Sequence, residues 1–386
     1  MPAEGRHDPP VDAPVRFLAR AGPGRTHRGP AWSRTDPRRP WGARHAVSEN
    51  LLSRTPLADE APFERALRPQ RLDEYIGQRA AVESLRVSVE AARQRGECLD
   101  HVLLYGPPGL GKTTLAIILA NEMGSGLKST SGPALERGDD LMGVLTSLEP
   151  RDVLFVDEIH RLPRIVEELF YPAMEDFEVN FVIERGMHAR TMRIPLKPFT
   201  LVGATTRPGM LSAPLRERFG IFHHLDFYAD EELARIVLRS AGILGVSIEP
   251  EGSAEIARRA RGTPRIANRL LRRVRDFAQV KGDGRIGLGV ADASLTMEGV
   301  DTRGLDRLDR RFLQAIVEHY GGGPVGLEAI AATINDDAET LAELVEPYLL
   351  KIGLVVRTPS GRRATPAAYR HLGHRGGEGP LQLSLE

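Results

Sequence analysis

The stretch from Gly106 to Thr114 has the residue types and the spacing of a phosphate-binding loop. It runs Gly-Pro-Pro-Gly-Leu-Gly-Lys-Thr-Thr and fits the pattern G-x-x-x-x-G-K-[ST]. Glycines let the backbone close around phosphate oxygens, and a helix that starts there directs N–H groups at them. Lys112 would reach the outer phosphates, and the Thr113 hydroxyl would hold Mg²⁺.

The segments on either side of this loop supply the context that the motif requires. An apolar run, 101–105, precedes it and predicts a buried strand, and a stretch rich in alanine and leucine, 115–123, follows it and predicts a helix. A glycine-rich turn that binds nothing is the alternative. The order of strand, glycine turn and helix favours phosphate binding.

Two acidic residues, Asp157 and Glu158, follow another apolar run, 153–156. Asp157 is expected to be the second group that holds Mg²⁺. Glu158 could polarise an attacking water as general base. An Asp-Glu pair after a strand is also typical of a helix N-terminus enriched in acids. The presence of the phosphate loop favours the catalytic interpretation.

Polar residues also follow a later apolar run, 199–204, which ends in Thr205 and Thr206. Thr206 could hydrogen-bond the γ-phosphate or the attacking water, and Thr205 is the competing candidate. The sequence does not separate the two. A threonine that caps a helix or turn is the simpler alternative.

Arginines recur in two further segments. Arg216 and Arg218 lie in 215–220, where one could stabilise charge on a transferring phosphoryl group, often from a neighbouring subunit. A surface helix with Arg/Glu pairs is the alternative. Arg265 follows Pro264, which suits the first turn of a helix, and could reach a nucleotide phosphate.

The elements that must position these residues alternate between strands and helices. That alternation predicts an α/β fold with a parallel sheet covered on both faces, and ligands in such sheets lie at the carboxyl ends of the strands. Residues 177–194 predict an inserted β-hairpin. The C-terminal part predicts three helices and two strands, which make a winged helix. Its wing carries Arg357, Arg362 and Arg363, placed for DNA phosphates, although a winged helix used only for protein contacts is the alternative.

Composition sets limits on the class of protein. The 386 residues carry zero formal net charge, so nucleic-acid contacts must come from local basic patches. The single cysteine, Cys98, excludes an intrachain disulfide and a cysteine-based zinc site. No apolar run approaches the length of about 20 residues that spans a bilayer. Residues 1–46 are rich in arginine and proline and predict disorder; a mis-chosen start is an alternative explanation for them.

Together, these motifs resemble the AAA+ ATPases and, closely, RuvB, a bacterial family of Holliday-junction branch-migration motors. The resemblance runs from about Leu67 to Leu372. The phosphate loop alone is generic, but the ordered set that ends in a winged helix is highly specific. Besides the phosphate loop, the set comprises Tyr75-Ile76-Gly77-Gln78, Asp157-Glu158-Ile159-His160-Arg161-Leu162, Tyr171-Pro172-Ala173-Met174-Glu175-Asp176, Gly203-Ala204-Thr205-Thr206-Arg207, Leu215-Arg216-Glu217-Arg218-Phe219-Gly220, Gly262-Thr263-Pro264-Arg265-Ile266-Ala267-Asn268-Arg269-Leu270-Leu271 and Arg357-Thr358-Pro359.

The resemblance implies a role for each of these sites. The residues implied to bind ATP and Mg²⁺ through the phosphate loop are Gly109, Gly111, Lys112, Thr113 and Thr114, with Asp157 as the second Mg²⁺ ligand. Glu158 completes the Walker B pair, and Thr206 is the sensor-1 position. The residues implied to form the nucleoside pocket are Leu67, Arg68, Tyr75, Ile76 and Tyr228, with help from Glu175, Asp176 and Phe177.

Other implied roles involve partners. Arg218 is the arginine finger that reaches into the adjacent subunit, with Arg216 close to it, and Arg265 is sensor 2. Arg357 and Arg362 match wing residues that contact duplex DNA. The hairpin 177–194 matches the element that docks on RuvA, although its tip departs from the usual family pattern. The resemblance further implies a hexameric ring, the RuvC resolvase as a further partner, and a cytoplasmic location.

The expected organisation has five parts. They are a disordered extension (1–60), a large AAA+ ATPase domain (61–228), a small helical lid domain (229–298), a winged-helix DNA-binding domain (299–375) and a flexible tail (376–386). Two other functions stay open at this stage. One is a clamp-loader-like switch ATPase, and the other is a nucleotide-gated DNA-binding protein that does not translocate.

Overall fold

The computed structural model describes residues 61–182 and 191–374. Three predicted features lie outside the described residues: the disordered extension (1–60), the tip of the hairpin (184–188) and the flexible tail (376–386). Within the described ranges, no helix combines the length and the apolar character that crossing a membrane requires.

A parallel sheet forms the centre of the first part of the described chain, as the alternation of strands and helices predicts. Five strands lie in the order β2-β3-β6-β1-β7, and each neighbouring pair is parallel. The strands are β1 (Val102–Tyr105), β2 (Leu127–Ser131), β3 (Val153–Asp157), β6 (Thr200–Thr205) and β7 (Ile221–His224). Because all five run the same way, their carboxyl ends meet at one edge of the sheet.

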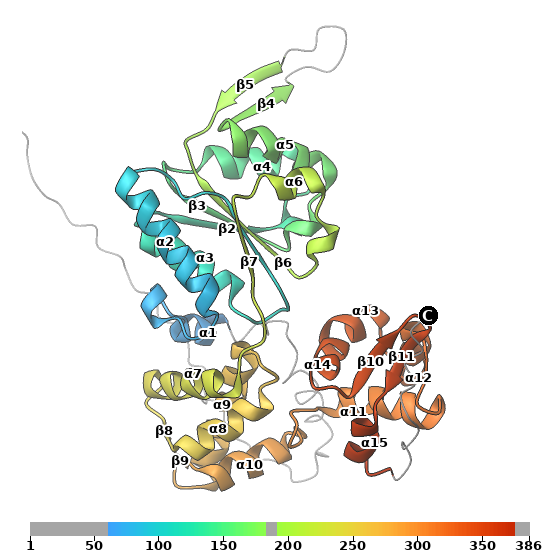
Figure 1. Ribbon diagram of the computed structural model, residues 1–386. Helices are drawn as coiled ribbons and strands as arrows, with labels where there is room; N and C mark the ends of the chain where they lie inside the picture. The colour runs from blue at the N-terminus through green and yellow to red at the C-terminus, as the bar shows by residue number, and fades with distance from the viewer. Residues whose placement is uncertain (1–60, 183–190, 375–386) are drawn as a thin grey trace, which may run out of the picture. The chain divides into compact units, whose positions relative to one another are not determined.

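Helices cover both faces of this sheet (Figure 1). Successive strand residues point to opposite faces, so Leu104 packs in the core under α2 and α3, while Leu103 packs in the core under α4, α5 and α6. A strand that is buried on both sides is apolar at every position, which explains the unbroken apolar runs in the sequence. The helices are α2 (Arg79–Arg95), α3 (Lys112–Met123), α4 (Gly138–Thr146), α5 (Arg164–Glu175) and α6 (Ala213–Glu217).

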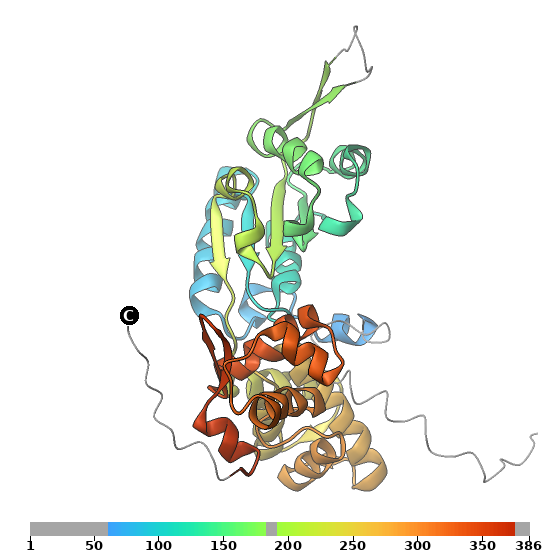
Figure 2. The same ribbon diagram turned by 90° about the vertical axis from the view of Figure 1, so that its right-hand side faces the viewer.

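The predicted hairpin is present and lies between α5 and β6. Strands β4 (Glu178–Val182) and β5 (Thr191–Pro195) pair antiparallel, with Val179 opposite Ile194. Val179 is buried in the core beneath α5, whereas the side chain of Met192 is 47% exposed. The base of the ribbon is therefore anchored, and the ribbon itself extends beyond the helices of its domain (Figure 2).

A small helical part follows the sheet. Its main helix, α9, has an amphipathic pattern and buries Ile266, Leu270 and Leu271. A short helix that precedes the sheet, α1 (Ala61–Leu67), packs against α7. The elements of this part are α7 (Asp230–Ile243), β8 (Ser247–Ile248), α8 (Pro250–Arg259), α9 (Pro264–Lys281), β9 (Arg285–Ile286) and α10 (Leu288–Met297).

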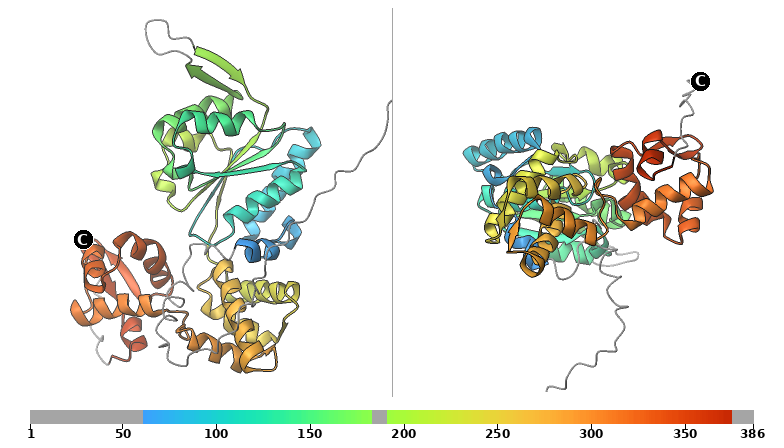
Figure 3. Two further views of the ribbon diagram at one scale, coloured as in Figure 1. Left: turned by 180° about the vertical axis from the view of Figure 1, so that it is seen from behind. Right: turned by 90° about the horizontal axis from the view of Figure 1, so that it is seen from below.

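The C-terminal part is the predicted winged helix (Figure 3). It has its own core, which includes Phe312, Ile330 and Leu349. Strands β10 and β11 form an antiparallel wing. The elements are α11 (Arg307–Gln314), α12 (Leu327–Ile334), α13 (Ala338–Thr340), α14 (Glu346–Lys351), β10 (Val355–Thr358), β11 (Gly361–Ala364) and α15 (Pro366–His371).

Candidate active site

The phosphate-binding motif forms the turn between β1 and α3. Gly109 and Gly111 have positive φ angles, 83° and 101°, a region that residues with a side chain rarely adopt. Lys112 is the first residue of α3, and its Nζ donates hydrogen bonds to the carbonyl oxygens of Gly106 (2.8 Å) and Pro107 (3.0 Å). The ammonium group therefore lies over the loop, where the motif requires it to be.

A pair of tyrosines closes one side of this loop. The hydroxyls of Tyr75 and Tyr228 lie 2.9 Å apart, and both lie beside the carbonyl oxygen of Leu110. A Cβ at Gly111 would lie 2.6 Å from the Tyr75 hydroxyl, so the loop must be bare at that point. Burial raises the pKa of Tyr75 to about 12 and that of Tyr228 well above its ordinary value, so both rings stay neutral.

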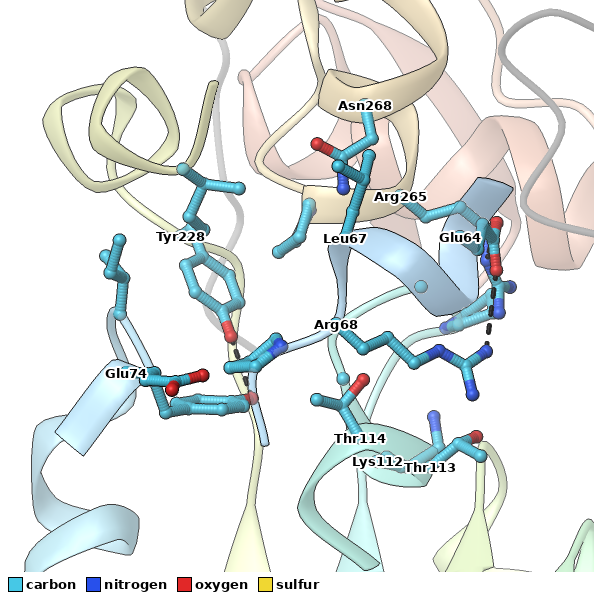
Figure 4. Close-up of a pocket in the computed structure, with 18 of the residues that line it drawn as sticks. Glu64, Leu67, Arg68, Glu74, Lys112, Thr113, Thr114, Tyr228, Arg265 and Asn268 are labelled. Atoms are coloured by element: carbon cyan, nitrogen blue, oxygen red, sulfur yellow. Dashed lines mark hydrogen bonds and ion pairs between the residues drawn. The ribbon is translucent and has the colours of Figure 1, made fainter. Parts of the chain in front are cut away.

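A pocket of about 350 Å³ opens above the loop (Figure 4). This volume suits a small-molecule ligand. It brings together residues from α1, the phosphate loop, the end of β3 and α9. The predicted residues that line it are Leu67, Arg68, Tyr75, Ile76, Gly109, Gly111, Lys112, Thr113, Thr114, Asp157, Glu158, Tyr228 and Arg265.

The pocket also contains polar residues that sequence reasoning missed. Glu64 lies 3.6 Å from Arg68 and 3.2 Å from Arg265, so one carboxylate serves two arginines. Arg239 donates to the carbonyl oxygen of Leu67 (2.8 Å). Helical spacing carried a signal for Glu64, which stands in α1 four residues before Arg68, the residue that directly follows the helix. The remaining unpredicted lining residues are Pro69, Glu74, Pro108, Ile236, Pro264 and Asn268.

The acidic pair stands at the carboxyl end of β3. Asp157 ends the strand, and its Oδ1 accepts a hydrogen bond from the Glu158 N–H (2.9 Å). Glu158 has a φ of 47°, a strained left-handed conformation that turns its side chain away from the strand direction. Burial, and then the neighbouring charge of Asp157, raise the pKa of Glu158. A raised pKa makes a carboxylate a better proton acceptor.

The structure distinguishes the two threonines at the carboxyl end of β6. Thr206 donates to Oε2 of Glu158 (3.3 Å), so its hydroxyl lies at the carboxylate that is predicted to be the general base. The hydroxyl of Thr205 is fully buried, accepts from the Arg207 N–H (3.0 Å) and pairs with Nδ1 of His160 (2.8 Å). These contacts favour Thr206 over Thr205 for the sensor position.

Three residues of the predicted nucleoside pocket lie elsewhere in the chain. Within this chain, Glu175, Asp176 and Phe177 do not line the pocket. The ring of Phe177 packs against His101 and Phe199, which precede β1 and β6. That position is at the amino ends of the strands, whereas the phosphate loop is at their carboxyl ends. The sheet therefore separates the three residues from the pocket of their own chain.

The two arginines of 215–220 lie at the same amino-terminal edge. The guanidinium of Arg218 lies 3.2 Å from the Glu175 carboxylate and 4.3 Å from the centre of the Tyr171 ring. Arg216 is exposed. Neither arginine lines the pocket of its own chain. Arg216 and Arg218 thus form a group with the three residues that the pocket excludes.

The oxygen donors at the pocket fit Mg²⁺. Thr113 offers a hydroxyl and Asp157 a carboxylate, and both line the pocket. Within residues 61–182 and 191–374, no group of three His, Cys, Asp or Glu side chains could hold a metal ion by itself. This fits Mg²⁺, because it is usually bound through one or two carboxylates together with substrate phosphates.

The predicted DNA-binding residues lie on the wing. Arg357 in β10 stands directly opposite Arg362 in β11. The side chain of Arg357 is 59% exposed and that of Arg362 is 25% exposed. Both are paired with Glu346, at the start of α14, which the sequence did not single out.

Three family models match consecutive parts of the chain. The Holliday junction DNA helicase RuvB P-loop domain matches residues 67–225, the RuvB AAA lid domain matches 228–301, and the RuvB C-terminal winged helix domain matches 302–373. The order of these matches is the order of sheet, helical part and winged helix in the structure.

Solved structures agree with the family models. The Thermotoga maritima RuvB Holliday junction branch migration motor is 50% identical, with a TM-score of 0.74, over 81% of this chain and 99% of that one. A proline-to-glycine variant of T. maritima RuvB gives a TM-score of 0.75 at the same identity, over 80% of this chain and 99% of that one.

Proposed function

Because the chain belongs to the RuvB family of Holliday junction branch migration helicases, we propose that it couples ATP hydrolysis in its pocket to movement of the duplex DNA held by its winged helix. One observation carries the proposal. The phosphate loop, the Asp157–Glu158 pair and the lid residue Arg265 all line a single pocket.

The roles of the pocket residues follow from their positions. Lys112 and the loop glycines bind the phosphates, while Tyr75 and Tyr228 form a neutral wall beside the loop. Glu158, held by Thr206, orients and deprotonates the attacking water. Thr113 and Asp157 would hold Mg²⁺, and the bound ion would neutralise charge on the phosphates.

The residues at the amino-terminal edge of the sheet act on another subunit. Five residues at this edge do not line the pocket of their own chain, which lies at the opposite, carboxyl-terminal edge. They are Arg216, Arg218, Glu175, Asp176 and Phe177. In a ring of subunits, a group that is excluded from its own site can complete the neighbour's site. Arg218 is thus the arginine finger in trans, and the active assembly is a hexamer.

The motor works through three parts, the large ATPase domain (61–228), the lid (229–298) and the winged helix (299–375). Hydrolysis changes the angle between the first two parts, and the wing arginines hold the DNA backbone while this happens. Contacts to phosphates carry no base information, so movement is independent of sequence.

The partners of the motor are DNA and two proteins. The hairpin 177–194 docks on RuvA, for which its projecting ribbon and the exposed Met192 are suited. RuvC joins the assembly that resolves the junction. The complex acts in the cytoplasm, where chromosomal junctions form in bacteria.

A synthetic four-way DNA junction tests this proposal. The purified chain is mixed with the junction and ATP, with RuvA present or withheld, and junction dissociation is followed on a gel. We expect dissociation that requires both ATP and RuvA. DNA-stimulated ATP hydrolysis without dissociation would instead indicate a switch or loader, or a hairpin that does not engage RuvA.

A further inference from the structure

Two arginines stand opposite each other on the wing. In the register of β10 and β11, Arg357 is the direct partner of Arg362. Arg362 exchanges both of its backbone hydrogen bonds with Val325 (2.7 and 2.9 Å), so its pairing with Arg357 is of the non-hydrogen-bonded kind. Side chains approach most closely in such pairs, and like charges directly opposite each other are destabilising. The arginine pair therefore needs an anion.

The chain supplies that anion from α14. The side chain of Glu346 is fully buried. Its Oε1 accepts from Nε of Arg357 (3.0 Å) and Nε of Arg362 (2.8 Å). Its Oε2 accepts from Nη2 of Arg357 (2.7 Å) and, more weakly, Nη2 of Arg362 (3.4 Å). Each guanidinium thus binds the same carboxylate as a fork, the geometry that fixes both distance and plane.

The charge state of Glu346 agrees with this geometry. Burial by itself raises the pKa of a carboxyl group, but the hydrogen bonds from Arg357 and Arg362 outweigh burial and lower the pKa of Glu346. The carboxylate also raises the pKa of Arg357. Glu346 is therefore charged at neutral pH, and because arginine side chains keep their charge in proteins, the cluster carries one net positive charge.

The forked pairing with Glu346 leaves N–H donors on both arginines that can bind a second anion. A guanidinium has five N–H donors, and binding to Glu346 uses one on Nε and one on Nη2. The donors on Nη1 and the second on Nη2 stay available on each arginine. The largely exposed side chain of Arg357 presents its share of them to solvent. A DNA phosphate can then bind without displacing the carboxylate.

We propose that Glu346 is a positioning residue for DNA binding, whose buried carboxylate holds Arg357 and Arg362 as one rigid phosphate-binding unit. The inference rests on the proposed contact of these arginines with DNA. Without the carboxylate, two flexible side chains would have to become ordered at each binding event, at a loss of affinity.

Because Glu346 is negatively charged, positioning and simple neutralisation predict opposite effects of Glu346→Gln on DNA affinity. If the carboxylate only neutralised the wing, Glu346→Gln would raise the net positive charge and tighten DNA binding. If it positions the arginines, the same substitution must weaken binding although the wing becomes more positive. The two mechanisms predict opposite signs for one measurement.

The measurement is fluorescence anisotropy of a labelled duplex with the full-length chain at several salt concentrations. We expect Glu346→Gln to weaken binding about tenfold, the size expected for two side chains that must be ordered on binding. Glu328→Gln is the matched control, because Glu328 is an exposed residue of α12 in the same domain. It removes the same charge and should leave the affinity unchanged or slightly higher. Unchanged or tighter binding by Glu346→Gln would overturn the proposal.

A second comparison separates positioning from loss of folding. In a chain that carries Arg357→Ala and Arg362→Ala, adding Glu346→Gln should weaken DNA binding no further, because the groups it positions are gone. A further loss of affinity would mean that Glu346 acts through the fold, and would overturn the inference.

The single arginine variants test whether the wing arginines contact DNA at all, on which the inference depends. If Arg357→Ala and Arg362→Ala each bind duplex as the unsubstituted chain does, the proposed wing contact fails and the inference falls with it. If both weaken binding while Glu346→Gln does not, the wing contact stands and only the positioning role is overturned.

Discussion

In both the nucleotide pocket and the wing, one glutamate pairs with two arginines, but the two clusters differ in the burial of the glutamate and in its distances to the arginines. In the pocket, Glu64 lies 3.2 to 3.6 Å from Arg68 and Arg265 and is 13% exposed. In the wing, Glu346 is fully buried and accepts three hydrogen bonds of 3.0 Å or less from its two arginines.

The two clusters differ in how firmly the carboxylate is held by its arginines. Glu64 lies on α1 and Arg68 directly follows that helix, whereas Arg265 lies in the first turn of α9, so the pocket cluster joins segments far apart in sequence. The wing arginines lie on paired strands beside the helix that carries Glu346. A loosely held carboxylate competes with an incoming phosphate for the arginines, whereas a deeply buried forked one orients them.

The largest expected effect is a loss of nucleotide binding at the pocket that leaves DNA binding at the wing intact. Lys112→Ala removes the ammonium group that lies over the phosphate loop, so nucleotide binding and ATP hydrolysis should fall to background. Duplex binding in the absence of nucleotide should stay within about twofold, because the wing does not depend on the loop. Release of inorganic phosphate and anisotropy of a labelled duplex measure the two halves. ATP turnover comparable to that of the unsubstituted chain would contradict the assignment of Lys112.

A smaller effect is expected from one wing arginine. Arg362→Ala should weaken duplex binding by roughly tenfold, the order expected for a hydrogen bond to a charged group. The slope of log affinity against log salt should fall by about one, since one phosphate contact is lost. Binding to unrelated duplex sequences should fall equally. A loss confined to one sequence would indicate base contacts instead.

The pocket glutamate should respond with the opposite sign to its counterpart in the wing. Glu64→Gln removes a negative charge next to two arginines that line the nucleotide pocket, so ATP affinity should rise by about two- to fivefold, a size typical of partly exposed ion pairs. Titration with a fluorescent ATP analogue measures this change. A fall in affinity would mean that Glu64 positions its arginines as Glu346 does, and the contrast between the two regions would disappear.

The smallest expected effect is the pH dependence of stability at the wing. The pKa of Glu346 is lowered by folding, from an ordinary value of 4.5. Its charged form therefore stabilises the fold above about pH 4.5, and this contribution is lost as pH falls through the lowered pKa. The difference in melting temperature between the unsubstituted chain and Glu346→Gln should be constant near neutrality and change only in acid. A difference that varied between pH 6 and 8 would exclude this origin.

Local motifs allowed much of the active site to be predicted from sequence. The phosphate loop and the Asp157–Glu158 pair are defined by neighbours within a few residues, and they lie where the strand ends require. The choice between Thr205 and Thr206 needed the structure, because adjacent residues at a strand end point in opposite directions and only His160 and Glu158, distant in sequence, decide between them.

Two features were beyond sequence reasoning for a different reason. The stretch Glu175 to Phe177 comes at the end of α5 and lies at the amino ends of the strands, away from the pocket of its own chain, and the motif by itself does not report this position. Glu346 stands 11 and 16 residues from its arginines, at a helix start where an acid is ordinary.

The base of the hairpin has a thermodynamic consequence for the proposed ring. Phe177, at the start of the hairpin, packs against His101 and Phe199, and two residues earlier Glu175 pairs with Arg218. If the proposed ring forms, a protein bound to the hairpin and a nucleotide of the next subunit that contacts Arg218 therefore act on one short segment. If the first ligand binds more tightly in one arrangement of that segment, reciprocity requires each ligand to change the other's affinity by the same factor.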